Sequence, residues 1–139
     1  MNQGDITIEP FNLENLKPGS YTFTLGSRLR KLKAKEYIDT RTKKQEYEEI
    51  DLGENGYLLD PGEFIVGFTQ EKIVLGKNIA CLLTARGSRA QSGLSVLHSD
   101  LFIEPESNGA MALAISNVSN MPIRLLPGIK IVKGIFFNL

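Results

Sequence analysis

Hydrophobic and polar residues alternate in residues 21–25, where tyrosine, phenylalanine and leucine are separated by threonines. A period of two is the pattern of a strand with one buried face and one exposed face. Further short runs of β-branched and aromatic residues, each expected to form a strand, occupy residues 62–68, 72–75, 79–83, 111–118 and 129–137. No stretch has the spacing of a helix longer than about two turns. The one short helical candidate is residues 86–94.

Turns rich in glycine, proline and asparagine separate these runs. They lie at residues 18–19, 53–56, 61–62, 76–78, 107–109 and 127–128. Short strands at this spacing favour a sandwich or barrel over a fold in which strands and helices alternate. We therefore predict an all-β fold. Residues 1–16 fit two alternatives, a part of the same barrel or an arm exchanged between subunits.

The chain has 139 residues, a size that predicts a single domain spanning residues 1–139. It carries 16 basic and 16 acidic residues, and its net charge of zero provides no general attraction for nucleic acid or for an anionic membrane. No apolar run approaches the ~20 residues that cross a bilayer, and the first residues lack the pattern of a signal peptide. We therefore expect a cytoplasmic protein without nucleic-acid or membrane partners. The single cysteine, Cys81, lies in an apolar run and is expected to be a small buried residue.

Residues 28–54 hold 15 of the 32 charged residues. Basic residues dominate the first half of this segment and acidic residues dominate the second half. A hairpin that turns near residues 40–45 would therefore place opposite charges across from each other. We interpret the segment as a solvated, self-neutralising hairpin and not as a nucleic-acid site, because its charges are balanced and aromatic residues are few.

The candidate chemistry is concentrated in residues 84–105. Arg86, Gly87 and Ser88 follow an apolar run. A turn without bulky side chains can offer backbone amides to phosphate oxygens, and the arginine can add a forked pair of hydrogen bonds. A second polar cluster follows and could contact the rest of a phosphorylated ligand. It consists of His98, Ser99, Asp100 and Glu104.

These residues also have interpretations without chemistry. The arginine turn could be a surface turn that needs a flexible glycine, the carboxylates could be solvated, and the histidine could lie on the surface or at an interface. Neighbouring side chains on a strand point to opposite faces, so His98, Ser99 and Asp100 cannot form a catalytic relay. One histidine and one cysteine far apart give no zinc site, and the carboxylates lack the spacing of a calcium loop. We predict no metal site.

Five segments, taken in order, resemble the dCTP deaminase and dUTPase superfamily and are nearer to its deaminase branch. Residues 86–94 are similar to the family's Arg-Ser-Ser-Leu-Ala-Arg-x-Gly-Leu phosphate motif. The other four segments, which correspond to family strands and turns, are residues 18–26, 57–67, 103–105 and 117–131. No single motif is specific, but five in the family's order identify it over residues 16–139.

The resemblance implies a distorted jelly-roll barrel of the β-clip, dUTPase-like kind that forms a homotrimer with nucleotide sites between subunits. One subunit would contact the phosphates through Arg86, Gly87, Ser88 and Gln91. Another would contact the sugar and base through His98, Ser99, Asp100, Ile103 and Glu104. The resemblance implies no required cofactor, with Mg²⁺ entering only through the ligand's phosphates.

Departures from the family pattern bear on the chemistry. Ala114 takes the place of the glutamate that moves protons in the deaminases, and a methyl group cannot accept a proton. Gly87 and Gln91 replace the serine and arginine of the phosphate motif. For the dUTPase reaction, Glu104 would replace the aspartate base, and no tyrosine follows it closely. The sequence also ends at Leu139 without the glycine-rich arm that covers the phosphates in dUTPases.

Three hypotheses follow. The first is a catalytically diverged family member that binds a nucleotide or a related phosphorylated ligand between subunits. The second is an enzyme of dUTP or dCTP metabolism, a pyrimidine deoxynucleotide triphosphate hydrolase or deaminase, with Glu104 as the base of the hydrolase. The third is a trimeric scaffold with a vestigial pocket, in which the charged hairpin at residues 28–54 contacts a protein partner.

Overall fold

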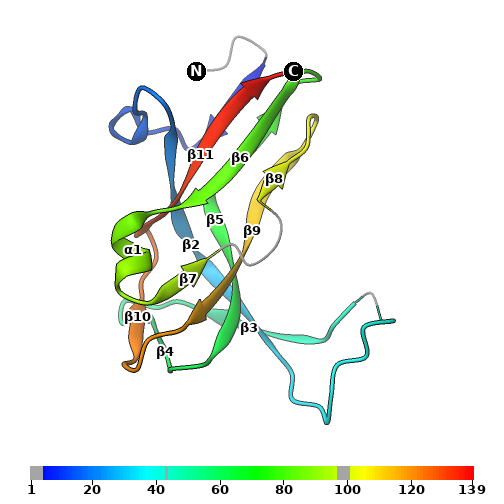
Figure 1. Ribbon diagram of the computed structural model, residues 1–139, viewed down its shortest axis with the longest axis vertical. Helices are drawn as coiled ribbons and strands as arrows, with labels where there is room; N and C mark the ends of the chain where they lie inside the picture. The colour runs from blue at the N-terminus through cyan, green and yellow to red at the C-terminus, as the bar shows by residue number, and fades with distance from the viewer. Residues whose placement is uncertain (1–4, 43, 97–100) are drawn as a thin grey trace.

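The computed structural model describes residues 5–42, 44–96 and 101–139. Strands dominate these residues, and no helix among them is long and apolar enough to cross a membrane. In chain order the elements in Figure 1 are β1 (Ile6–Glu9), η1 (Leu13–Asn15), β2 (Tyr21–Leu32), β3 (Tyr47–Asp51), β4 (Tyr57–Leu59), β5 (Phe64–Leu75), β6 (Ile79–Ala85), α1 (Gly87–Gln91), β7 (Leu94–Val96), β8 (Phe102–Ile103), β9 (Asn108–Asn117), β10 (Ile123–Leu125) and β11 (Lys130–Asn138).

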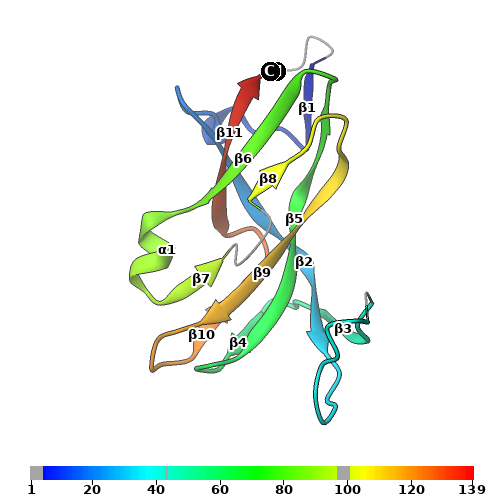
Figure 2. The ribbon, with the colours of Figure 1, turned by 45° about the vertical axis from the view of Figure 1, so that its right-hand side comes forward.

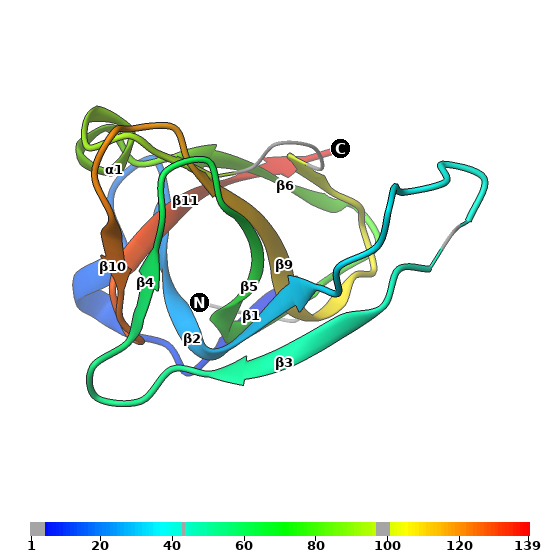
Figure 3. The ribbon, with the colours of Figure 1, turned by 90° about the horizontal axis from the view of Figure 1, so that it is seen from below.

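Nine of the described strands form one sheet that curls on itself, as the view from below in Figure 3 shows. Its main path runs in the order β7-β9-β5-β2-β11-β6-β8, while β1 pairs with β5 and β3 pairs with β2. The strands β10 and β4 form a separate two-stranded ribbon at one end of the curled sheet (Figure 2). The prediction of an all-β fold is confirmed, because the α-helix has only five residues.

β5 is longer than the sequence pattern predicts. It joins the runs at residues 62–68 and 72–75, which the pattern separates into two strands, and that separation is wrong. The polar residues between the two runs do not end the strand, because its pairing with β9 shifts register between Phe68 and Lys72 and then continues. A register shift of this kind inserts extra residues on one strand and bends the sheet.

The N-terminal segment pairs within the same chain. β1 lies antiparallel to the last part of β5, with Ile6 opposite Leu75 and Ile8 opposite Ile73. Ile8 is buried, so this strand contributes to the core as well as to the sheet. Of the two alternatives for residues 1–16, the structure therefore places residues 6–9 in the barrel.

The inward faces of the strands share one cluster of buried hydrophobic side chains. Its largest fully buried members include Tyr21, Phe23, Leu25, Leu29, Leu113 and Ile115. Cys81 belongs to the same cluster, and burial raises the pKa of its thiol to about 12. The expectation that this cysteine is a small buried residue is confirmed.

The charged segment forms a hairpin with opposite charges across from each other, as predicted. In the pairing of β2 with β3, Arg28 lies opposite Asp51 and Arg30 opposite Glu49. Arg30 Nε is 2.8 Å from Glu49 Oε2, and Arg28 Nη1 is 3.4 Å from Glu49 Oε1. The side chains of Arg28, Arg30 and Glu49 are largely solvent-accessible, although the Arg30 Nε atom itself is buried and its contact with Glu49 lacks hydrogen-bond geometry. Each pair therefore stabilises the fold by only about 0–1 kcal/mol.

A more enclosed polar cluster surrounds Glu63, whose side chain is 15% exposed. Tyr57 donates its hydroxyl hydrogen bond to this carboxylate, the Asp60 N–H donates at 2.9 Å, and Lys31 Nζ lies 3.3 Å away. Burial acts to raise the pKa of Glu63, but the hydrogen bonds from Tyr57 and Asp60 and the charge of Lys31 outweigh it and lower the pKa below its ordinary value of 4.5. The ionised carboxylate thus ties β2, β4 and the start of β5 together.

We expect Glu63→Gln to remove part of the acid sensitivity of the fold. A carboxyl with a lowered pKa in the folded state contributes stability above its unfolded pKa, near 4.5, and loses it as pH falls through the folded value. The unfolding temperature of the parent should therefore fall more steeply below about pH 5 than the unfolding temperature of the variant. The exposed Glu54→Gln change is the matched control, and parallel pH profiles for parent and Glu63→Gln would contradict the assignment.

Candidate functional site

Two arginines converge at the start of β11. Arg86 follows β6 directly, and Arg89 lies one helical turn later in α1. Residues three apart on a helix share a face. Arg86 Nη1 and Arg89 Nε both donate to the carbonyl oxygen of Lys130, at 3.5 Å and 3.0 Å. Because a guanidinium has five N–H donors, most donors of both arginines remain for other acceptors.

Gly87 is not required by the backbone. It begins α1 and is absent from the glycines with positive φ, so any residue could adopt its conformation. A Cβ added there would meet no atom within 4 Å. The alternative of a turn that needs a flexible glycine is therefore wrong, and Gly87 leaves an open surface between Arg86 and the exposed Ser88. Gln91 is exposed at the other end of α1.

The second predicted cluster lies on another part of the sheet. β8 pairs with β6, with Ile103 opposite Cys81, and the partly buried Ile103 packs against the core. Glu104 is exposed in the turn that follows, where its carbonyl accepts hydrogen bonds from the Ser107 N–H at 3.3 Å and hydroxyl at 2.7 Å. The other three predicted residues of this cluster, His98, Ser99 and Asp100, lie outside the described residues.

Within one chain, Glu104 lies far from Arg86 along the sheet. The pairing places Glu104 beyond the Ile103–Cys81 pair in the direction of Ala80, whereas Arg86 follows the opposite end of β6. At about 3.3 Å per residue, the two backbones are roughly 20 Å apart along the strand. Figure 2 shows the same arrangement, with α1 at one end of β6 and β8 beside its other half. A short ligand that contacts both Arg86 and Glu104 therefore requires two copies of the chain.

Ala114 is partly exposed on the outer face of β9, opposite Val66 of β5. The outer face continues with the exposed Ala112 and Ala110, whereas the residues between them point into the core. A row of methyl groups offers neither a proton donor nor a proton acceptor. The structure therefore puts no titratable side chain of β9 at the position where the deaminase pattern has glutamate.

Sequence reasoning missed Arg89, which stands where the family motif has leucine. The signal was its spacing of three residues from Arg86, which places both guanidinium groups on one side of a helical turn. Lys130, which both side chains contact, is 44 residues from Arg86 and 41 residues from Arg89 in the sequence. A local sequence pattern could therefore not predict these contacts. Within the described part of the chain, no group of three or more histidine, cysteine or acidic residues is placed to hold a metal ion.

Comparison with known proteins agrees with these motifs. The model of the dCTP deaminase-like family matches residues 1–139. A Corynebacterium glutamicum protein named dCTP deaminase, dUMP-forming, is 33% identical over 144 residues, which cover all of this chain and 76% of that protein. A Nanoarchaeum equitans protein of the same name is 31% identical over 157 residues, which cover all of this chain and 79% of that protein.

Solved structures show the same fold at lower identity. The 2'-deoxycytidine 5'-triphosphate deaminase of Agrobacterium tumefaciens superposes with a TM-score of 0.74 at 18% identity, over 95% of this chain and 43% of that longer chain. A mutant dUTPase of Staphylococcus bacteriophage 80alpha, solved with dUpNHpp, superposes with a TM-score of 0.60 at 13% identity, over 98% of this chain and 91% of that one. By its family match and by relatives above 30% identity over its whole length, the chain belongs to the dCTP deaminase-like family.

Proposed function

We propose that this protein binds a pyrimidine deoxynucleotide or a related phosphorylated ligand at sites between copies of the chain, and that it does not deaminate the ligand. The copies form a homotrimer in the cytoplasm. Arg86 contacts the phosphates together with Gly87, Ser88 and Gln91, and the segment that includes Ile103 and Glu104 contacts the sugar or base from another copy.

The observation that supports a site between copies is the separation of Arg86 from Glu104 within one chain. Arg86 and Glu104 follow opposite ends of the β6–β8 pairing, roughly 20 Å apart in one chain. Relatives named dCTP deaminase, dUMP-forming, align over the whole chain, which supports a pyrimidine deoxynucleotide as ligand. The dUTPase neighbour solved with dUpNHpp supports the same ligand class on the same fold.

The phosphate half of the proposed site rests on guanidinium chemistry. Arg86 donates one hydrogen bond to the Lys130 carbonyl oxygen, at 3.5 Å. A phosphate oxygen can replace or supplement a hydrogen bond of this length. Arg89 is held more closely, at 3.0 Å, and adds a second positive charge to the same place. Paired guanidinium groups bind phosphates through short, charge-assisted hydrogen bonds. Any Mg²⁺ would arrive with the phosphates.

Absence of deamination rests on Ala114. Attack of water on a cytosine ring needs a group that moves protons between the water and the ring, and such general acid–base catalysis contributes about 10²–10⁴ in rate. The outer face of β9 offers Ala112 and Ala114 at this place, and neither can exchange a proton. Binding without turnover is the function that this combination supports best.

Calorimetry with dCTP, dUTP, dTTP, dUMP and cyclic nucleotides, with and without Mg²⁺, tests the proposal. We expect at least one pyrimidine deoxynucleotide to bind at one site per chain, while chromatography after incubation detects no deaminated or hydrolysed product. The absence of a measurable heat of binding for every ligand of the panel, at millimolar concentration, would refute binding. Product formation would refute the absence of chemistry, and its loss in Glu104→Gln would then support the hydrolase alternative.

The assembly is tested separately. Light scattering coupled to size-exclusion chromatography should give the mass of three 15.4 kDa chains. A monomer that still binds nucleotide at full stoichiometry would contradict a site between copies. Mixing the two variants Arg86→Ala and Glu104→Gln should restore about one intact site per mixed trimer, since each intact site draws its halves from different chains.

A further inference from the structure

The hairpin between β2 and β3 ends in a segment that leaves the curled sheet. We define the arm as residues 33–46, which Figure 3 shows projecting away from the strands. Strand pairing ends where the Lys33 N–H donates to the Glu46 carbonyl at 2.9 Å. Beyond this bond, the described residues of the arm form no helix or strand.

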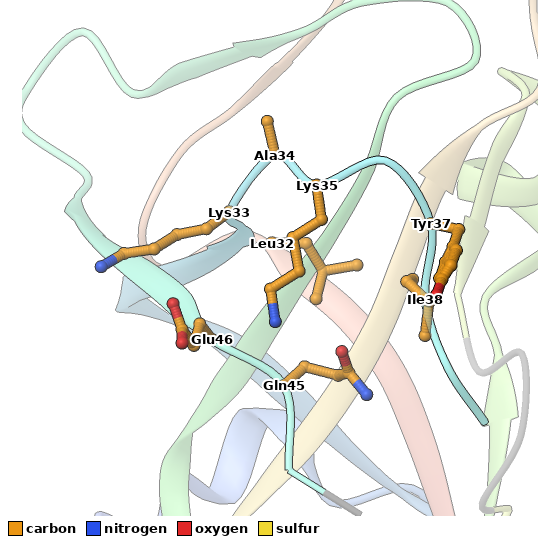
Figure 4. A pocket seen from close by; sticks show the side chains of 8 residues that line it. All are labelled: Leu32, Lys33, Ala34, Lys35, Tyr37, Ile38, Gln45 and Glu46. Carbon is orange, nitrogen blue, oxygen red and sulfur yellow. The ribbon is translucent and has the colours of Figure 1, made fainter. Parts of the chain in front are cut away.

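The base of the arm encloses a hollow of about 240 Å³. Leu32, Tyr37 and Ile38 supply apolar walls, and Lys33 and Lys35 supply ammonium groups. Figure 4 shows Tyr37 and Ile38 together on one side and Lys33 with Glu46 on the other. The volume lies below the ~300–1,000 Å³ of typical small-molecule sites, so one anchoring side chain fits it better than a whole ligand.

The apolar walls are strongly exposed. The exposed fraction is 70% for Tyr37 and 54% for Ile38. Single exposed apolar residues are ordinary, but Tyr37 and Ile38 line one hollow, so one apolar side chain of a partner could be buried against both. Tyrosine is also enriched among the residues that dominate binding at protein interfaces.

The charges of the arm are not all balanced internally. Nearby cations have partners, since Lys31 pairs with Glu63 at 3.3 Å and Arg41 pairs with Asp39 at 2.7 Å. Lys33 and Lys35 have no ion-pair partner among the described residues, and both line the hollow. The arm as a whole contains five basic and three acidic residues. Its excess charge is positive, and the occupant that complements it is negative.

We propose that the arm is a docking site for an acidic peptide segment of a partner protein. One large apolar side chain of the segment enters the hollow against Tyr37 and Ile38, and carboxylates on either side pair with Lys33 and Lys35. Paired apolar and ionic contacts of this kind give both an anchor and a register. The site lies on the hairpin and does not involve Arg86, so it is independent of the proposed nucleotide site.

Selection of a phage-displayed library of random twelve-residue peptides on the biotinylated full chain tests the proposal. We expect the enriched peptides to be acidic and to share one large apolar residue. Fluorescence anisotropy with the most enriched peptide, synthesised with a fluorescein label, then gives its affinity. The affinity should fall at least tenfold in Lys33→Glu/Lys35→Glu and in Tyr37→Ala/Ile38→Ala, and should weaken as salt rises.

The exposed Lys77→Glu change, in the turn between β5 and β6, is the charge control and should leave the affinity within twofold of the parent. Both arm variants should keep the parent's unfolding temperature and nucleotide binding. No enrichment, enrichment without acidic residues, or binding that the arm variants leave unchanged would each overturn the proposal. So would a Tyr37-dependent self-association, or tighter arm-dependent binding to single-stranded DNA or phosphatidylserine vesicles than to any enriched peptide.

Discussion

Arg86→Ala is expected to raise the dissociation constant of the deoxynucleoside triphosphate by about ten- to a hundredfold. Hydrogen bonds to charged groups contribute about 1.5–3 kcal/mol, and 1.4 kcal/mol corresponds to a factor of ten. The Arg86 guanidinium is only partly buried, and its one observed bond, to Lys130, is 3.5 Å long. Its loss should therefore remove phosphate contacts without unfolding the chain. Calorimetry with the best-bound ligand of the panel measures the change.

Two further variants distinguish the contribution of the paired guanidinium donors of Arg86 from the contribution of its positive charge. Arg86→Lys keeps the charge but loses the planar pair of donors, so it should recover only part of the affinity. Lys17→Ala removes an exposed positive charge elsewhere and should leave the affinity near that of the parent. Arg86→Ala should also weaken the triphosphate more than the matching monophosphate. Equal losses for the two ligands would show that Arg86 does not contact the outer phosphates.

The β-branched and aromatic runs predicted β2, β5, β6, β9 and β11, whose apolar side chains fill the core, but they did not predict the short strands β4, β7, β8 and β10. The alternation at residues 21–25 marks the first part of β2, but the expectation of one exposed face is wrong, because Thr22 and Thr24 are buried as well. The same periodicity cannot report a register shift. Thr69 and Glu71 read as a polar break between two strands, yet both are buried within β5 because they bond to neighbouring strands. Such bonds depend on long-range contacts that no local window contains.

For the candidate site, too, the local motifs could be predicted from the sequence, whereas their placement relative to each other could not. Arg86, Gly87 and Ser88 are contiguous, so a motif finds them, and Ile103 with Glu104 is found in the same way. Their mutual placement depends on which strand lies beside β6, and a single sequence does not specify that pairing. The separation of roughly 20 Å between Arg86 and Glu104 follows from the pairing of β8 with β6, and it supports the proposal of a site between two copies.

Gly87 and Ala114, two departures from the family pattern, both lie on accessible surface. Gly87 leaves open space in which a serine would fit without strain. Ala114 likewise sits on an accessible outer face opposite Val66. The fold therefore does not require glycine at residue 87, and Ala114 leaves its outer face partly open. Under the proposed function, Ala114 would therefore remove the proton carrier without altering the fold around it.

Glu71→Ala is expected to lower the free energy of unfolding by about 3 kcal/mol, since hydrogen bonds to a charged group contribute about 1.5–3 kcal/mol each and a buried donor left unpaired costs about 1–3 kcal/mol. Glu71 is 3% exposed. It accepts from the Thr24 N–H at 2.9 Å and from the Thr24 hydroxyl at 2.6 Å. Thr69 makes a similar bond to β9 on the other side of β5, since its hydroxyl accepts from the Met111 N–H at 2.9 Å. These side chains replace ladder bonds where the register of β5 shifts between Phe68 and Lys72.

Urea and thermal unfolding of three matched variants separate the causes. Glu71→Gln keeps one acceptor for the Thr24 N–H, and the rotatable Thr24 hydroxyl can accept from the new amide while donating to Gln70, which it already contacts at 3.1 Å. Glu71→Met keeps most of the volume but no acceptor. If the hydrogen bonds dominate, Glu71→Met loses as much free energy of unfolding as Glu71→Ala, whereas Glu71→Gln loses less than half of that amount. If Glu71→Met instead resembles the parent, packing volume and not the carboxylate holds β2 to the bulge of β5.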